Sequence, residues 1–137
     1  MREILYRALS ICRGEHWVYG QPRHYARNPH TEKWTIYDPA TGIETDIVEE
    51  TIGQYTGLND IKRNPIYEGD ILRVTSLQHD TLGKKMNVAV EYNEGMAQFI
   101  VKNGEKRQAL GLCALTNDVV VIGNLNDNTE LLKGGEK

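Results

Sequence analysis

The sequence predicts a mainly β protein, α+β at most, with one or two short helices. Two observations carry this prediction. Apolar and polar residues alternate over many short segments that are rich in valine, isoleucine and aromatic residues, which is the pattern of half-buried strands. Proline, glycine and asparagine recur between these segments as turn signals. With 137 residues, the chain is long enough for one ordinary domain with a real core.

The first half of the chain predicts an N-terminal β lobe that spans residues 1–58. Strands are expected at residues 4–9, 16–19, 34–37 and 47–55. Residues 21–31 are polar and contain two prolines, so we expect an exposed loop there. Residues 38–42 read Asp-Pro-Ala-Thr-Gly, which predicts a turn, because proline fixes its own φ angle and glycine accepts a positive one.

The second half predicts a small, barrel-like lobe of the SH3 type, residues 59–137. Strands are expected at residues 66–74, 87–92, 97–101 and 119–125. Asn93-Glu94-Gly95 is expected to form a three-residue hairpin loop, with the glycine in the left-handed conformation. Asn103-Gly104 predicts a second tight turn between neighbouring strands.

The last third of the chain supplies the expected helices. Residues 109–115 are compatible with either a short helix or a strand. Asparagine and aspartate at 126–128 are good N-cap residues, so a last short helix is expected at 129–133, ended by Gly134-Gly135. Residues 1–137 are therefore interpreted as a single domain made of two lobes.

The composition excludes several classes of protein. A hydrophobic fraction of 39% and a net charge of −3 exclude a disordered chain. The longest apolar run, residues 119–122, is far shorter than the roughly 18 residues of a spanning helix. The first seven residues hold no apolar core of signal-peptide length. We therefore expect no membrane association and a cytoplasmic location. Cys12 and Cys113 flank no motif, so buried free thiols are expected instead of a disulfide.

Glu68 and Asp70 are the strongest candidates for an acid–base pair. In a strand they would point to the same face, roughly 7 Å apart, which is a usable spacing for proton transfer. The structural alternative is that Gly69 makes a bulge or tight bend while the two carboxylates accept backbone N–H groups. We favour the structural interpretation and expect no catalytic residues.

Metal and cofactor sites find little support in the sequence. Cys12, His16, His24 and His30 are the available ligands, but their spacing matches no compact zinc pattern. No nucleophile elbow and no phosphate-binding glycine-rich loop is present. The sequence therefore predicts a protein that is not an enzyme and holds no metal or cofactor.

The candidate interaction surface lies in the first 40 residues, which carry six of the ten aromatic residues and a net charge of +2. Its members are Trp17, Tyr19, Arg23, Tyr25, Arg27 and Trp34. Aromatic rings beside cations suit single-stranded nucleic acid, because bases stack and phosphates pair. Residues 41–137 carry a net charge of −5, however, and would repel a polyanion. We therefore rank a protein contact, including contact with a second copy, above nucleic-acid binding.

Residues 51–72 are the most informative segment. The pattern at 51–58, Asp60 and 66–71 resembles the YopX family of phage and prophage proteins, and the segments at 2–8 and 121–132 agree with it. Asn64-Pro65, Thr129 and Leu9 depart from the family pattern in turn and packing details. The residues interpreted as a structural motif are Gly53, Tyr55, Gly57, Asp60, Tyr67, Glu68, Gly69, Asp70, Gly123 and Asn124.

The resemblance implies a mostly β fold with a barrel-like C-terminal half, a phage or prophage origin and self-association, and it implies no catalytic residues. We therefore expect a non-enzymatic accessory protein of the bacterial host cytosol that forms a homo-oligomer and contacts phage or host proteins. The alternative is a β-barrel protein that binds single-stranded nucleic acid.

Overall fold

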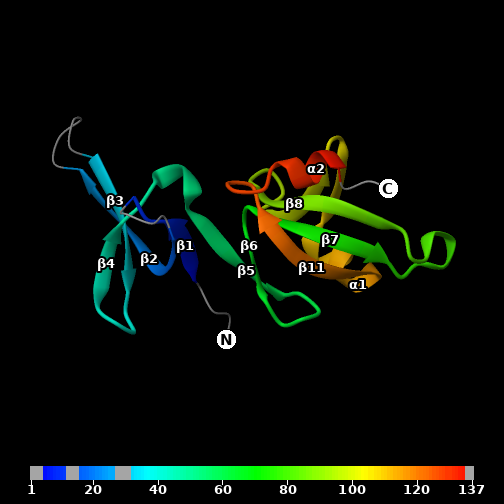
Figure 1. The fold of residues 1–137 in the computed structure, drawn as a ribbon, viewed down its shortest axis with the longest axis horizontal. Helices are drawn as coiled ribbons and strands as arrows, with labels where there is room; N and C mark the ends of the chain where they lie inside the picture. The colour runs from blue at the N-terminus through cyan, green and yellow to red at the C-terminus, as the bar shows by residue number, and fades with distance from the viewer. Residues whose placement is uncertain (1–4, 12–15, 27–31, 135–137) are drawn as a thin grey trace. The chain divides into compact units, whose positions relative to one another are not determined.

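The computed structural model describes residues 5–11, 16–26 and 32–134 (Figure 1). The chain divides into two compact units, Met1–Tyr55 and Thr56–Lys137, whereas the expected lobes meet after residue 58. The mainly β prediction is confirmed, because antiparallel strands make up most of both units and the helices are short. Each unit has its own apolar core.

The first unit is an antiparallel sheet in the order β4-β3-β2-β1-β5. Its strands are β1 (Tyr6–Leu9), β2 (Trp17–Ala26), β3 (Glu32–Asp38), β4 (Ile43–Asp46) and the start of β5 (Gly53–Asn59), with a 3₁₀ turn, η1 (Glu49–Thr51), before β5. Gly53 and Gln54 of β5 pair with β1, and its later residues belong to the second unit. The core is small: Ala8, Ile36 and Ile47 are buried, and Trp34 packs against them.

The predicted loop at 21–31 is wrong over its first part, because β2 continues through Pro22 to Ala26. Pro22 pairs with Ile36 of β3. Within the described residues β1 accompanies β2 only as far as Gly20, so β3 is the one described strand beside the later residues of β2. A proline, which lacks an N–H, is tolerated at such an edge. Residues 27–31 lie outside the described residues.

The predicted strand at 47–55 is also wrong in part, and β4 before it was not predicted. Thr51 explains the break. Its hydroxyl donates to the carbonyl of Val48 (2.7 Å) and accepts the N–H of Leu9 (2.9 Å), which closes η1 against β1. The turn at 38–42 agrees with the prediction, since the N–H of Gly42 bonds to the carbonyl of Asp38 at 2.7 Å.

The second unit is a five-stranded antiparallel sheet in the order β10-β9-β8-β7-β11. The five strands are β7 (Asp70–Ser76), β8 (Lys85–Asn93), β9 (Gln98–Asn103), β10 (Lys106–Ala109) and β11 (Asn117–Asn124). A further short strand, β6 (Pro65–Tyr67), pairs with β5 and is not part of this sheet. The remaining elements are η2 (His79–Thr81), α1 (Leu110–Thr116) and α2 (Glu130–Gly134). β10 and β11 are the two edges, and within the described residues no pairing joins them, so the sheet is open and no closed barrel forms.

Helix α1 settles the open interpretation of residues 109–115. Leu110 and Cys113, three positions apart, are buried in the core of the second unit, while Leu112 and Leu115 face outward. This three-residue spacing of the buried positions is helical. Among the helices of the described segments, none combines the length and the apolar character that crossing a bilayer requires.

The predicted hairpin after β8 forms, but its loop differs from the prediction. Asn93 pairs with Gln98, so the loop has four residues, 94–97. The left-handed residue is Ala97, with φ of 52°, instead of Gly95. Asn93 stabilises this longer loop, because its side-chain oxygen accepts the N–H of Met96 at 3.0 Å. The second predicted turn agrees: Asn103 pairs with Lys106 around Gly104.

A tight turn at Glu68-Gly69 joins β6 to β7. Gly69 has φ of +92°, and its backbone is held on both sides: its N–H donates to the carbonyl of Val90 and its carbonyl accepts the N–H of Leu125, both at 2.8 Å. A residue with a Cβ is strained at this φ angle. The position therefore favours glycine for a backbone reason.

We predict that Gly69→Ala lowers the free energy of unfolding by about 1–2 kcal/mol through backbone strain. No atom beyond the neighbouring residues lies within 4 Å of a Cβ placed there, so no steric clash contributes. Gly111→Ala is the matched control, because this site in α1 is equally open. The control should gain stability, since alanine is the better helix former. Urea denaturation measures both, and equal stability of Gly69→Ala and the parent would contradict the account.

Candidate functional site

Glu68 and Asp70, the candidate acid–base pair, belong to the turn between β6 and β7. Asp70 is only 1% exposed, and its Oδ2 accepts the N–H of Tyr67 at 2.8 Å. Glu68 is partly exposed and lies in the turn itself, so the two carboxylates do not follow one another along one strand. Asp70 therefore stabilises the turn, and its carboxylate is too buried for ready contact with a substrate.

Asp60 is a second buried carboxylate, and it accepts four hydrogen bonds. Oδ1 takes the N–H groups of Lys62 (2.9 Å) and Asn64 (2.8 Å), while Oδ2 takes the N–H of Val121 (3.0 Å) and the side-chain amide of Asn64 (3.3 Å). Burial raises the pKa of Asp60, but the hydrogen bonds from Val121, Asn64 and Lys62 outweigh burial, so the pKa lies below its usual value. Asp60 is therefore ionised at neutral pH.

The other motif residues of the second unit meet along β11. The pairing of β7 with β11 shifts register between Val121 and Gly123, next to the N–H that Asp60 accepts. A Cβ at Gly123 would lie 2.6 Å from Oδ1 of Asn128, the atom that accepts the N–H of Asn124 at 3.2 Å. The segments around Asp60, Gly69 and Gly123 thus hold one another through backbone hydrogen bonds.

Three motif residues lie in β5. Gly53 is buried and pairs with Arg7 of β1, and the N–H of Tyr55 donates to the carbonyl of Leu5 at 2.7 Å. Gly57 has φ of +88°. Like the residues along β11, Gly53 and Tyr55 take part in strand pairing.

The structure brings only part of the predicted interaction surface together. Trp17, Tyr19, Arg23 and Tyr25 alternate along β2 and therefore share one face of the sheet. Trp34 lies on the opposite face: it pairs with His24, packs on the core and stacks on the His24 ring at 4.4 Å. Arg27 lies outside the described residues.

The cations on that face have acidic neighbours on β4. Glu44 accepts the hydroxyls of Tyr25 and Thr35, both at 2.6 Å, and forms an ion pair with Arg23 at 3.4 Å. Hydrogen bonds from Thr35 and then Tyr25 lower the pKa of Glu44, so it stays ionised at neutral pH. Lys33 pairs in the same way with Asp46 at 3.2 Å. Neither carboxylate was predicted as a partner of these cations, because β4 was not predicted.

Two cations of this face, Arg23 and Arg7, also lie over aromatic rings. The Arg23 guanidinium lies over Tyr37 at 4.2 Å, and that of Arg7 lies over Trp17 at 4.4 Å. These rings pack against neighbouring cations of the same sheet, so less of the aromatic surface is left for stacking bases than the sequence suggests.

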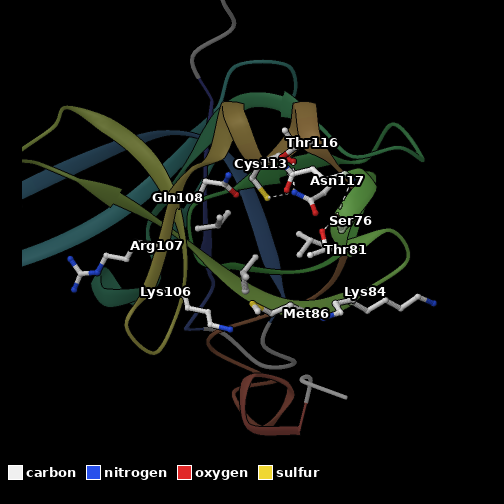
Figure 2. A pocket seen from close by; sticks show the side chains of 15 residues that line it. Ser76, Thr81, Lys84, Met86, Lys106, Arg107, Gln108, Cys113, Thr116 and Asn117 are labelled. Atoms are coloured by element: carbon white, nitrogen blue, oxygen red, sulfur yellow. Dashed lines mark hydrogen bonds between the residues drawn. The ribbon is translucent and has the colours of Figure 1, made fainter.

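The second unit contains a pocket of about 710 Å³ that the sequence analysis did not identify (Figure 2). It lies between β8 with the η2 loop on one side and β10 on the other, and Cys113 and Thr116 of α1 also line it. The floor is apolar and is formed by Val74, Met86, Val88, Val101 and Cys113. A pocket of this size is within the usual range of ligand sites.

Among the described residues, the cations that line the pocket are Lys84, Lys85, Lys106 and Arg107, and none of the described lining residues is a carboxylate or an aromatic residue. Within the described residues, Lys84, Lys85 and Arg107 form no ion pair. In Figure 2, Lys84 and Arg107 lie on opposite sides of the pocket and extend outward from its rim. The only signal for these cations in the sequence is the pair of short basic runs, 84–85 and 106–107.

Some of the neutral polar side chains that line the pocket form hydrogen bonds within it or to the adjacent backbone. The hydroxyls of Ser76 and Thr81 lie 2.6 Å apart, and the Asn117 amide donates to the Cys113 carbonyl at 3.0 Å. Burial raises the pKa of the Cys113 thiol, which makes it a poor nucleophile at neutral pH. Among the described residues no group of histidines, cysteines and carboxylates could hold a metal ion. The pocket is therefore equipped for binding anionic groups and offers no acid–base pair.

We predict that Asp60→Asn lowers the free energy of unfolding at pH 7 by about 2–3 kcal/mol, because the amide places a donor against N–H groups. The folded-state pKa of Asp60 lies below the unfolded value, so its contribution is present above about pH 4 and is lost as the pH falls through the folded pKa. The stability of the variant should therefore change less across this acid range.

Asp118→Asn is the matched control, because it makes the same charge change on β11 and its carboxylate makes no hydrogen bond to the described residues. Denaturant unfolding between pH 3 and 7 measures both variants. Superimposable stability profiles for the two would show that Asp60 does not hold the turn and β11 together.

The family model described as YopX protein matches residues 5–133, which is nearly the whole chain. A search of curated proteins finds no match. The matched region includes the segments around Asp60, Gly69 and Gly123 that hold the second unit together, and the chain belongs to the YopX protein family.

Proposed function

We propose that the protein is a non-enzymatic accessory protein of phage or prophage origin that acts through protein contacts, including contacts with a second copy of itself. The observation that carries the proposal is the different placement of the carboxylates and the cations. The buried carboxylates Asp60 and Asp70 are bonded to the backbone, whereas cations around an apolar pocket face outward. Such a surface suits binding and offers no paired acid and base. Phage origin and a location in the bacterial host cytosol follow from the family resemblance.

Self-association is supported by the edge of the first sheet. Among the described strands, β4 has β3 as its only neighbour. At its end the carbonyl of Asp46 accepts the N–H of Ile11 at 3.1 Å, but the start of β4, around Ile43, has no described strand on its other side. Ile43, at its start, is 61% exposed. An exposed strand edge next to an apolar side chain is a surface on which a second copy can add its own edge.

The alternative, binding of single-stranded nucleic acid by the front face, has weaker support. Arg23 and Lys33 are paired with carboxylates, which reduces the positive potential that phosphates would meet. Trp34, the second tryptophan of the expected stacking surface, lies on the other face of the sheet. We therefore keep this function as second to protein contact.

We predict that the protein has a mass in solution that is a multiple of 15.5 kDa at micromolar concentration, and that Ile43→Lys shifts it toward 15.5 kDa. A lysine at an edge strand opposes pairing with another edge. Leu82→Lys is the matched control, because Leu82 is 70% exposed in the other unit, and its mass should equal that of the parent. Light scattering coupled to size exclusion measures all three.

Two results would contradict the proposed self-association through β4. A parent mass of 15.5 kDa at every concentration would exclude self-association. An oligomeric Ile43→Lys variant would exclude β4 as the contact.

A further inference from the structure

We propose that the pocket of the second unit binds an acidic segment of a partner protein, with one aliphatic side chain on the apolar floor and carboxylates on the surrounding cations. This inference deepens the protein-contact function proposed above and rests on it. The partner is defined by its chemistry: an extended stretch of aspartate and glutamate interrupted by one apolar residue.

The charges of the pocket point to an anionic occupant. Lys84, Lys85 and Arg107 form no ion pair with any described residue, unlike Arg23, Lys33 and Lys102, which pair with Glu44, Asp46 and Glu91. Asp80 and Glu105 lie next along the chain to the lining segments, yet both are exposed and neither lines the pocket. The chain as a whole is acidic, with a net charge of −3, so a group of unpaired cations is a local exception. Its charge complements an acidic segment.

The floor requires an apolar part in the same ligand. Val74, Val88 and Val101 belong to the core and Met86 packs against it, and all four line the pocket. The three valines are nearly buried and Met86 is partly exposed, so a free carboxylate or phosphate ion would pair with the rim and leave chiefly Met86 in contact with water. An aliphatic side chain between acidic residues covers the floor and places charges on the rim at the same time.

The edge strand β10 favours an extended peptide. Among the described strands, β9 is its only neighbour, and β10 carries Lys106, Arg107 and Gln108 of the pocket lining. An extended segment can add to such an edge through main-chain hydrogen bonds while alternate side chains enter the pocket. The position of β10 at the sheet edge thus suits a peptide strand.

Nucleic acid fits the same site less well. Single-stranded nucleic acid gains much of its affinity from bases that stack on aromatic rings. None of the residues that line the pocket is aromatic. Phosphates would find the lysines, but the bases would find only valine, methionine and cysteine side chains. The lining therefore favours a peptide over an oligonucleotide.

The test is fluorescence anisotropy of labelled ten-residue peptides against the full chain. The probe contains aspartate and glutamate with one central leucine, and a second probe replaces the leucine with serine. A single-stranded DNA of equal length is the third probe. The triple variant Lys84→Gln/Lys85→Gln/Arg107→Gln removes the unpaired cations. Its matched control, Lys62→Gln/Arg63→Gln/Lys102→Gln, removes three cations that do not line the pocket.

We expect the leucine peptide to bind the parent and the control with similar affinity, with weaker binding at higher salt. The triple variant should lose about tenfold or more in affinity, and the serine peptide should bind several-fold more weakly than the leucine peptide. DNA should bind more weakly than the leucine peptide.

Several outcomes would overturn the proposal. These are equal peptide affinity of the parent and the triple variant, equal affinity of the two peptides, or tighter binding of DNA that the triple variant abolishes.

If the triple variant becomes monomeric, the occupant is a second copy of this chain and the assignment to a separate partner fails. If no peptide binds while the parent remains oligomeric, the pocket assignment fails and the proposed protein-contact function stands. A monomeric parent that binds the leucine peptide would support the pocket assignment and exclude only the contact with a second copy.

Discussion

The arrangement of the second unit depends on the carboxylate of Asp60. It is 5% exposed and joins two distant parts of the chain, the turn at 60–64 and Val121 of β11. β11 is an edge of its sheet, so the outward-facing N–H of Val121 takes its acceptor from outside the sheet, and the register of β11 against β7 shifts just after this residue. β11 then continues to Leu125, which bonds to the carbonyl of Gly69. One ionised side chain thus fixes where the last strand lies, and with it the turn that leads into β7.

The charged groups of the chain fall into two kinds. Carboxylates are used for structure: Asp60 and Asp70 accept backbone N–H groups, and Glu44 and Asp46 neutralise cations on the first sheet. Lys84, Lys85 and Arg107 have no such counterpart within the described residues. Leaving cations unpaired around an apolar floor gives the folded chain no stability, and proteins often accept such a cost at binding sites.

Local sequence signals predicted much of the fold, but the sites depend on contacts across the sheets. Alternation and turn residues located β8, β9 and the turn at Gly104, because these elements are hairpins. The strand expected at 66–74 is wrong in part, since the turn at Gly69 divides it into β6 and β7. The break at η1 was missed, since it depends on a hydrogen bond between Thr51 and Leu9 of another strand. Glu44 faces Arg23 only through the register of β2, β3 and β4. The pocket likewise joins residues 84–85 and 106–107, which no local pattern connects.

The central claim is that the cations around the pocket serve binding and not the stability of the fold. It is tested most directly by the dependence of the melting temperature on ionic strength for Lys84→Gln/Lys85→Gln/Arg107→Gln. If these cations serve binding and have no partners in the fold, the variant should melt at the same temperature as the parent or higher in low salt, because repulsion among them is removed. The difference should shrink as added salt screens the charges. A lower melting temperature in low salt, recovered in high salt, would show that the cations already pair within the folded chain and would contradict the account.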